Sequence, residues 1–138
     1  MPRRMSNLST LAHQHRQIKR RQIDELLALA EYLPKADQAL IEQVLRGNLR
    51  IAQIARLYRM PPRHLQRKAE SIIKRLSNKL FKFVAIQMNT LPVEVRPTAR
   101  CVVLNGMSMR KTAQVSGITL HRVRQNMNTV QATARLFA

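Results

Sequence analysis

The chain contains an internal repeat, in which one arrangement of apolar, proline and small residues occurs twice, 58 residues apart. The first copy begins at Leu33-Pro34 and the second at Leu91-Pro92. Seven apolar positions then match between the copies: Leu45, Ile51, Ala55, Met60, Leu65, Ala69 and Ile72 in the first, and Val103, Met109, Ala113, Ile118, Val123, Met127 and Val130 in the second. Because each copy of a repeat must be one structural unit, the sequence predicts two units of the same design.

The spacing of the apolar residues predicts an all-α protein. They recur three and four positions apart, and only three glycines and six prolines interrupt them. No alternating apolar and polar run of useful length occurs, which argues against strands. We expect helices at 35–46, 51–58 and from Pro62 onward in the first copy. In the second copy we expect them at 93–104, 109–116 and 120–134, although Pro97 is awkwardly placed inside the first of these and favours a later start.

The predicted organisation has three parts. Residues 1–32 form a basic N-terminal helical extension, 33–88 form a first tri-helical module, and 89–138 form a second. The extension ends at Leu33 because a residue before proline is disfavoured in a helix. The apolar face that begins at Leu65 continues through Phe83 to Met88, so we expect the third helix to run on as a long helix that joins the two modules.

The turn between the second and third helices is the most informative local feature. A small residue, Ala55 or Ala113, lies in the middle of the short second helix and allows the next helix to cross closely. Four residues later the turn favours glycine, which Gly117 supplies, whereas the first copy has Arg59. A short helix, a tight turn and a second helix form the helix-turn-helix motif, with which many proteins enter the major groove of DNA.

The charge of the chain indicates a polyanionic partner. The sequence has 25 Lys and Arg residues against 7 Asp and Glu, a formal net charge of +18. A protein surface that contacts only water does not require such an excess of positive charge, whereas a surface that binds nucleic acid does. Both copies are basic, since residues 1–82 carry 18 basic and 6 acidic residues and residues 83–138 carry 7 and 1. Double-stranded DNA is therefore the predicted partner, and the expected location is cytoplasmic and nucleoid-associated.

The first copy resembles a known family of DNA-binding modules. From Leu33-Pro34 through Ile54-Ala55, Met60 and Leu65 to Leu76, the chain resembles the helix-turn-helix of bacterial sigma factor region 4. The break at Gly47-Asn48 after its first helix, and its short helices, are also similar to those of small regulators of fimbrial and plasmid operons. The resemblance covers 33–76 well and 91–130 more loosely, and no segment resembles the parts of a sigma factor that bind core polymerase. It implies a bacterial transcription regulator with two such modules.

In this family, and in helix-turn-helix proteins generally, the start and outward face of the third helix read bases. The corresponding residues are Arg63, Gln66, Arg67 and Glu70 in the first copy and His121, Arg124, Gln125 and Asn128 in the second. Arg pairs with guanine, Gln and Asn with adenine, and Glu with cytosine. Eight further side chains are predicted to contact phosphates: Arg50, Arg56, Arg59, Lys68, Arg110, Lys111, Thr119 and Arg122. A basic cluster precedes the first copy, at Arg16, Lys19, Arg20 and Arg21. Three roles stay open for this cluster: contact with the nucleic-acid backbone, binding of RNA, or a solvated face without a partner.

Other chemistry has little support. His13 and His15 point to different sides of a helix and no Cys or carboxylate cluster joins them, which argues against a metal site. Cys101, the only cysteine, is predicted to be a buried structural thiol because its neighbours are apolar. The seven carboxylates form no set typical of a nuclease, and no glycine-rich phosphate loop or long apolar run occurs. We expect no enzyme activity, no cofactor, no metal and no membrane span.

Alternatives from other classes stay open. One is the bipartite DNA-binding region of a recombinase or transposase, which requires a catalytic domain beyond Ala138. Another is a basic RNA-binding protein, which the charge favours but the repeat and the few aromatic residues do not. One copy can also have turned to protein contact, with RNA polymerase or a second copy of the chain as the partner. The second copy, with fewer charges and more apolar residues, is the better candidate for dimerisation.

Overall fold

The computed structural model describes residues 20–137, which form helices joined by short turns, with no strand in this range. The predicted all-α class is confirmed. Contacts divide the described chain into two compact units, one of residues 20–31 and 35–76 and the other of residues 32–34 and 77–137. We call them unit 1 and unit 2. No helix within residues 20–137 combines the length and the apolar character needed to span a membrane.

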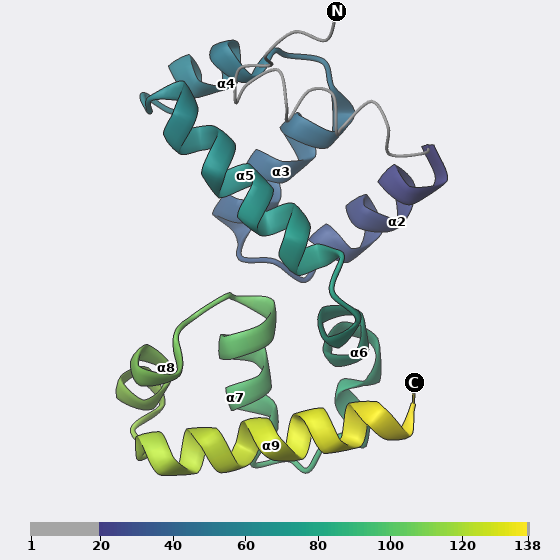
Figure 1. The fold of residues 1–138 in the computed structure, drawn as a ribbon, viewed down its shortest axis with the longest axis vertical. Coiled ribbons are helices and arrows are strands. Elements are labelled where there is room, and N and C mark those ends of the chain that lie inside the picture. Colours follow the sequence, from purple (N-terminus) through teal and green to yellow (C-terminus); the bar gives the residue numbers. More distant parts are fainter. Residues whose placement is uncertain (1–19, 138) are drawn as a thin grey trace, which may run out of the picture. The chain divides into compact units, whose positions relative to one another are not determined.

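Unit 1 consists of four helices. They are α2 (Arg20–Ala30), α3 (Lys35–Arg46), α4 (Ile51–Leu57) and α5 (Pro62–Leu76). α5 packs against the other three, and α2 also packs against α3 (Figure 1). Each helix contributes apolar side chains to one core, among them Leu26, Ile41, Ile54, Leu65 and Ile72, all at most 8% exposed.

Unit 2 has the same order of helices. They are α6 (Lys79–Gln87), a 3-10 turn η1 (Met88–Thr90), α7 (Arg96–Ala99) continued by the π-helical turn η2 (Arg100–Leu104), α8 (Met109–Ser116) and α9 (Leu120–Leu136). α9 contacts α8, α7 and α6, as α5 contacts the other helices of unit 1 (Figure 1). The helices at 35–46 and 109–116 have the predicted bounds, and the helix expected from residue 93 begins at Arg96, beside Pro97.

The structure extends the repeat by one helix and corrects the predicted connector. α2 and α6 lie at the same offset of 58 residues, with Leu26 matching Val84, both buried. The apolar face after Leu76 therefore belongs to the first helix of unit 2. α5 ends at Leu76, and the side-chain oxygen of Asn78 accepts a 2.8 Å hydrogen bond from the backbone N–H of Leu80. Because an Asn side chain competes for backbone groups in this way, the expected continuous helix is broken there.

The offset of 58 is not constant through the second helix of the repeat. α3 buries Leu40, Ile41, Val44 and Leu45, whereas α7 and η2 bury Thr98, Ala99, Val103 and Leu104. The extra residue lies in η2, where the backbone N–H of Asn105 bonds to the carbonyl of Arg100, five residues earlier, at 3.0 Å. A π-turn absorbs one inserted residue in this way. By burial, Val103 corresponds to Val44, not to Leu45 as the sequence suggested.

Candidate nucleic-acid interface

The turns that precede α5 and α9 have the same backbone geometry. After α4, the N–H of Met60 bonds to the carbonyl of Ala55 at 3.0 Å, and the N–H of Ile118 bonds to that of Ala113 at 3.2 Å after α8. Such a six-residue closure requires a left-handed residue just before the donor. Gly117 adopts it with φ of +69°, and Arg59 adopts it with φ of +52°. Arg59 therefore adopts in unit 1 the left-handed conformation that glycine supplies in unit 2.

Side-chain caps fix where the helices of this region begin. The hydroxyl of Ser108 accepts from the backbone N–H of Lys111 at 3.0 Å at the start of α8. At the start of α9, the hydroxyl of Thr119 accepts from the backbone N–H of Arg122 at 3.1 Å. In unit 1 the side chain of Gln53 accepts from the backbone N–H of Arg50 at 2.9 Å. These bonds satisfy amide groups that a helix start leaves free and fix the direction of α4, α8 and α9.

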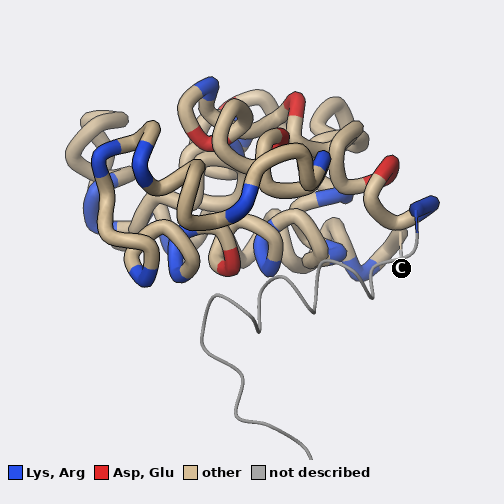
Figure 2. The backbone as a smooth tube through the Cα atoms, turned by 90° about the horizontal axis from the view of Figure 1, so that it is seen from above, with Lys and Arg blue, Asp and Glu red and all other residues tan. Residues whose placement is uncertain are grey.

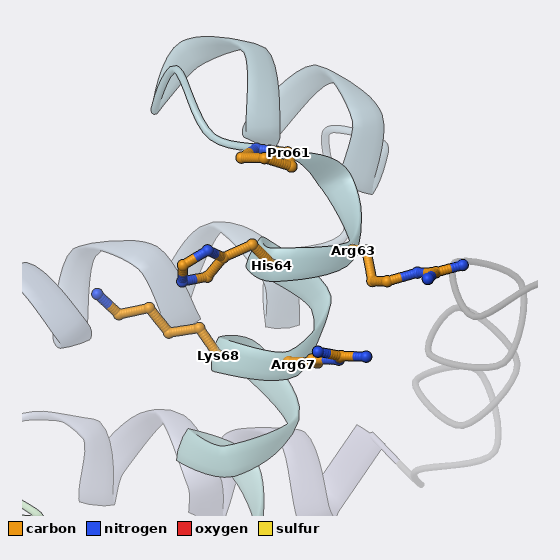
Figure 3. A pocket seen from close by; sticks show the side chains of 5 residues that line it. All are labelled: Pro61, Arg63, His64, Arg67 and Lys68. Atoms are coloured by element: carbon orange, nitrogen blue, oxygen red, sulfur yellow. The ribbon is translucent and has the colours of Figure 1, made fainter.

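The first two turns of α5 carry four exposed basic side chains around an open hollow of about 480 Å³. Figure 3 shows Arg63 and Arg67 on one side of the helix and His64 and Lys68 on the other. Each pair is four residues apart, which places its members one above the other. No described residue forms a hydrogen bond or ion pair with Arg63, His64 or Arg67. Three cationic or proton-donating side chains are therefore free to bind a ligand.

Gln66 does not have the outward placement that the sequence predicted. It is 3% exposed, and its amide donates to the side chain of Glu70 at 3.0 Å. Its own side-chain oxygen has no described partner. Glu70 is half-buried beside it. The predicted outward placement is therefore wrong for Gln66, whose side chain lies inside the unit, and the Glu70 carboxylate accepts its hydrogen bond.

In unit 2 the exposed face of α9 is the predicted one. His121, Arg124, Gln125 and Asn128 are all exposed. They are spaced by three, four and seven residues, so they share one side of the helix. Asn126 is instead buried and donates to the hydroxyl of Thr98, on α7, at 3.0 Å. Sequence reasoning did not find this pair, since neither residue type suggests a core position.

The difference between the two faces has a simple cause. Asn126, which is buried in unit 2, corresponds to exposed Lys68 in unit 1, whereas exposed Arg124 corresponds to buried Gln66. α9 therefore turns a slightly different side toward its core than α5 does. The exposed side of α5 also includes His64, Ser71 and Lys74. The apolar period of α5 alone could not reveal His64, because Gln66 and His64 are equally polar.

All eight residues predicted to contact phosphates are exposed. Seven are exposed charged side chains and the eighth is the exposed cap Thr119: Arg50, Arg56, Arg59, Lys68, Arg110, Lys111, Thr119 and Arg122. Arg20 and Arg21 of the N-terminal cluster are exposed too, while Arg16 and Lys19 lie outside the described residues, as do His13 and His15. Basic residues outnumber acidic ones along the described chain (Figure 2).

Ion pairing with carboxylates differs between the units. In unit 1, Asp37 lies 3.3 Å from Arg75 and 4.0 Å from Lys68, whose side chain is 44% exposed. Such a long, exposed pair is weak, so Lys68 can exchange Asp37 for a phosphate. Residues 77–137 contain nine Lys and Arg residues and one acidic residue, Glu94, and no ion pair forms among them. The positive charge of unit 2 is thus not neutralised within its described part.

Other candidate chemistry gains no support from the geometry. Within residues 20–137, no three His, Cys, Asp or Glu side chains gather as metal ligands would. Cys101 lies in η2 and is partly exposed, not buried as predicted. Comparisons with protein-family models, with curated proteins and with solved structures find no match to the chain. The two faces at the starts of α5 and α9 are the best candidate site.

Proposed function

We propose that the protein is a sequence-specific, double-stranded DNA-binding regulator of transcription with one helix-turn-helix module in each unit. One observation carries the proposal: α5 and α9 each follow the same left-handed turn and begin with an exposed face of unpaired polar and basic side chains. The likeness of residues 33–76 to sigma factor region 4 supports the same reading. We propose RNA polymerase as a further protein partner of this regulator.

Base reading would be unequal in the two modules. Unit 1 offers Arg63, His64 and Arg67, which favours guanine, since Arg binds its O6 and N7 atoms with two hydrogen bonds. Unit 2 offers His121, Arg124, Gln125 and Asn128, a set that can also bind adenine through the two amides. The exposed Arg and Lys residues beside each face supply the phosphate contacts that fix orientation and give most of the affinity.

The decisive experiment is selection of bound duplexes from a random pool by the full chain, followed by affinity measurements across salt concentrations. We expect a composite site with two half-motifs, and a loss of about a thousand-fold or more between about 50 and 200 mM salt if about six phosphates are neutralised. A single motif would mean that one unit alone reads DNA. A flat salt response, or no enriched motif, would contradict the proposal.

Competition separates the alternative functions. Structured RNA that displaces the selected duplex at equal concentration and fixed salt would favour a basic RNA-binding protein. A recombinase or transposase region would instead select the ends of one element and would belong to a longer chain with a catalytic domain.

Arg46→Ala serves as the charge-matched control for interface variants, because Arg46 is exposed at the end of α3 and lies outside the predicted contacts.

A further inference from the structure

Unit 2 has an open groove of about 600 Å³ between α6 and the last turns of α9. Its surface is largely apolar and includes Leu80, Phe83 and Ile86 of α6 together with Phe137. The rings of Phe83 and Phe137 are 5.5 Å apart between centroids, and Ile86 and Phe137 are more than half exposed. The groove lies toward the opposite end of α9 from the start of that helix, since His121 and Arg135 are separated by about 20 Å of helix at 1.5 Å per residue.

The positions of α2 that correspond to the α6 side of the groove are polar or small, so the shared fold does not require large apolar residues there. At the offset of 58 residues, Leu80 corresponds to Gln22, Lys82 to Asp24, Phe83 to Glu25 and Ile86 to Ala28. Asp24, Glu25 and Ala28 are exposed on α2. Unit 1 thus shows that a unit of this architecture can carry acidic and small residues here. The exposed apolar side chains of unit 2 need another explanation, and a binding partner is the usual one.

The charge at the edge of the groove defines the partner. Lys79, Lys82 and Arg135 line it, and no acidic residue between 20 and 137 does. A second copy of this chain, with 25 basic against 7 acidic residues, would be repelled. Nucleic acid would satisfy the cations but has no aliphatic side chains to cover the exposed Ile86 and Phe137. A segment with one apolar face and flanking carboxylates fits both properties.

We propose that this groove binds an acidic amphipathic helix of a partner protein. Apolar side chains of that helix would cover the exposed Ile86 and Phe137, while its carboxylates would pair with Lys82 and Arg135. The proposal does not rest on DNA binding, because it concerns a different surface from the starts of α5 and α9. It holds or fails whichever ligand those faces bind.

The test uses the full chain and three labelled peptides of about 18 residues, which is five helical turns. The first has Leu and Phe at helical spacing on one face and Asp and Glu elsewhere. The second has the same composition with the apolar residues distributed around the helix, and the third has Lys in place of the acidic residues. Fluorescence anisotropy at about 0.15 M salt, where the Debye length is about 8 Å, limits general attraction to the basic chain.

We expect the first peptide to bind at least about tenfold more tightly than the other two, because only it matches both surfaces. Ile86→Asp should weaken it about tenfold or more, and Lys82→Asp about three- to tenfold. Ala28→Asp makes the same change at the equivalent exposed position of unit 1 and should have no effect. Circular dichroism melts confirm that each variant is folded.

Several results would overturn the proposal. Equal binding of the first two peptides would show simple attraction between opposite charges, as would equal losses for Ala28→Asp and Ile86→Asp. No binding of the first peptide would exclude this class of partner. Anionic phosphatidylglycerol vesicles that bind through Ile86 without competition from the peptide would make the groove a membrane contact. Concentration-dependent dimers that Ile86→Asp abolishes would make a second copy the occupant.

Discussion

Replacing Arg59 by glycine tests the role of the turn before α5. Arg59 is the one non-glycine residue between 20 and 137 with positive φ, at +52°, and its side chain is exposed. The left-handed region costs an L-residue about 1–2 kcal/mol. Glycine removes this cost but gives the unfolded chain more freedom, which offsets about 0.4–1 kcal/mol. Because the Arg59 side chain has no described partner, nothing else is lost.

Arg59→Gly should therefore stabilise the protein by about 0.5–1 kcal/mol, which raises the melting midpoint by about 2–8 °C. The matched control is Gly117→Arg, which places arginine at the equivalent turn of unit 2. An added Cβ at Gly117 meets no heavy atom within 4 Å, so the expected destabilisation comes from the backbone alone. Urea and thermal denaturation, followed by circular dichroism, measure both changes.

The same variant should change DNA binding in the opposite direction if Arg59 contacts a phosphate. Arg59→Gly should weaken binding evenly across sequences and reduce the magnitude of the salt slope by about one. Increased stability with decreased affinity would separate the two roles of this residue. A destabilised Arg59→Gly, or a Gly117→Arg variant as stable as the original chain, would refute the argument that the left-handed turn limits stability.

Three further predictions concern single side chains. Gln66→Met should be neutral or stabilising in denaturation and leave DNA affinity unchanged, because the buried amide has an oxygen without a described partner; loss of affinity alone would restore Gln66 as a base reader. Asn126→Ala should cost about 1–3 kcal/mol by leaving the Thr98 hydroxyl unpaired, and a double-mutant cycle with Thr98→Val should show coupling, whereas additive effects would contradict the buried hydrogen bond. Arg67→Ala and Arg124→Ala should each cost about 1–3 kcal/mol of binding and relax preference at separate base positions of the selected site. Equal losses on every sequence would mean that both touch only phosphate.

The sequence predicted the parts of the fold that depend on local rules. The helix bounds at 35–46 and 109–116 follow from proline, glycine and capping residues near the helix ends. Such residues start or end a helix through contacts with neighbours only a few positions away in the sequence. The preference for glycine at this turn, met by Gly117, was likewise visible in the sequence, and the structure adds that Arg59 adopts the same left-handed conformation. The repeat itself was visible because equivalent core positions in two copies of a fold need similar side chains.

Other features depended on which helix face meets the core. The predicted connector merged α5 with α6 because an apolar stripe looks the same whether one helix or two bury it, and the capping bond of Asn78 decides between them. The inserted residue in η2 shifted the register of Val103 for a similar reason. Neither outcome is encoded in the apolar spacing.

The candidate site shows the same division. The sequence by itself determined that this chain is helical, repeated and strongly basic, because periodicity, punctuation and charge are properties of the residues alone. Only the tertiary structure decided that Gln66 and Asn126 face the core and that His64 faces solvent. The physical reason is that a small rotation of a helix about its axis exchanges neighbouring polar residues between core and surface. That rotation is set by contacts with other helices, such as the hydrogen bond between Asn126 and Thr98.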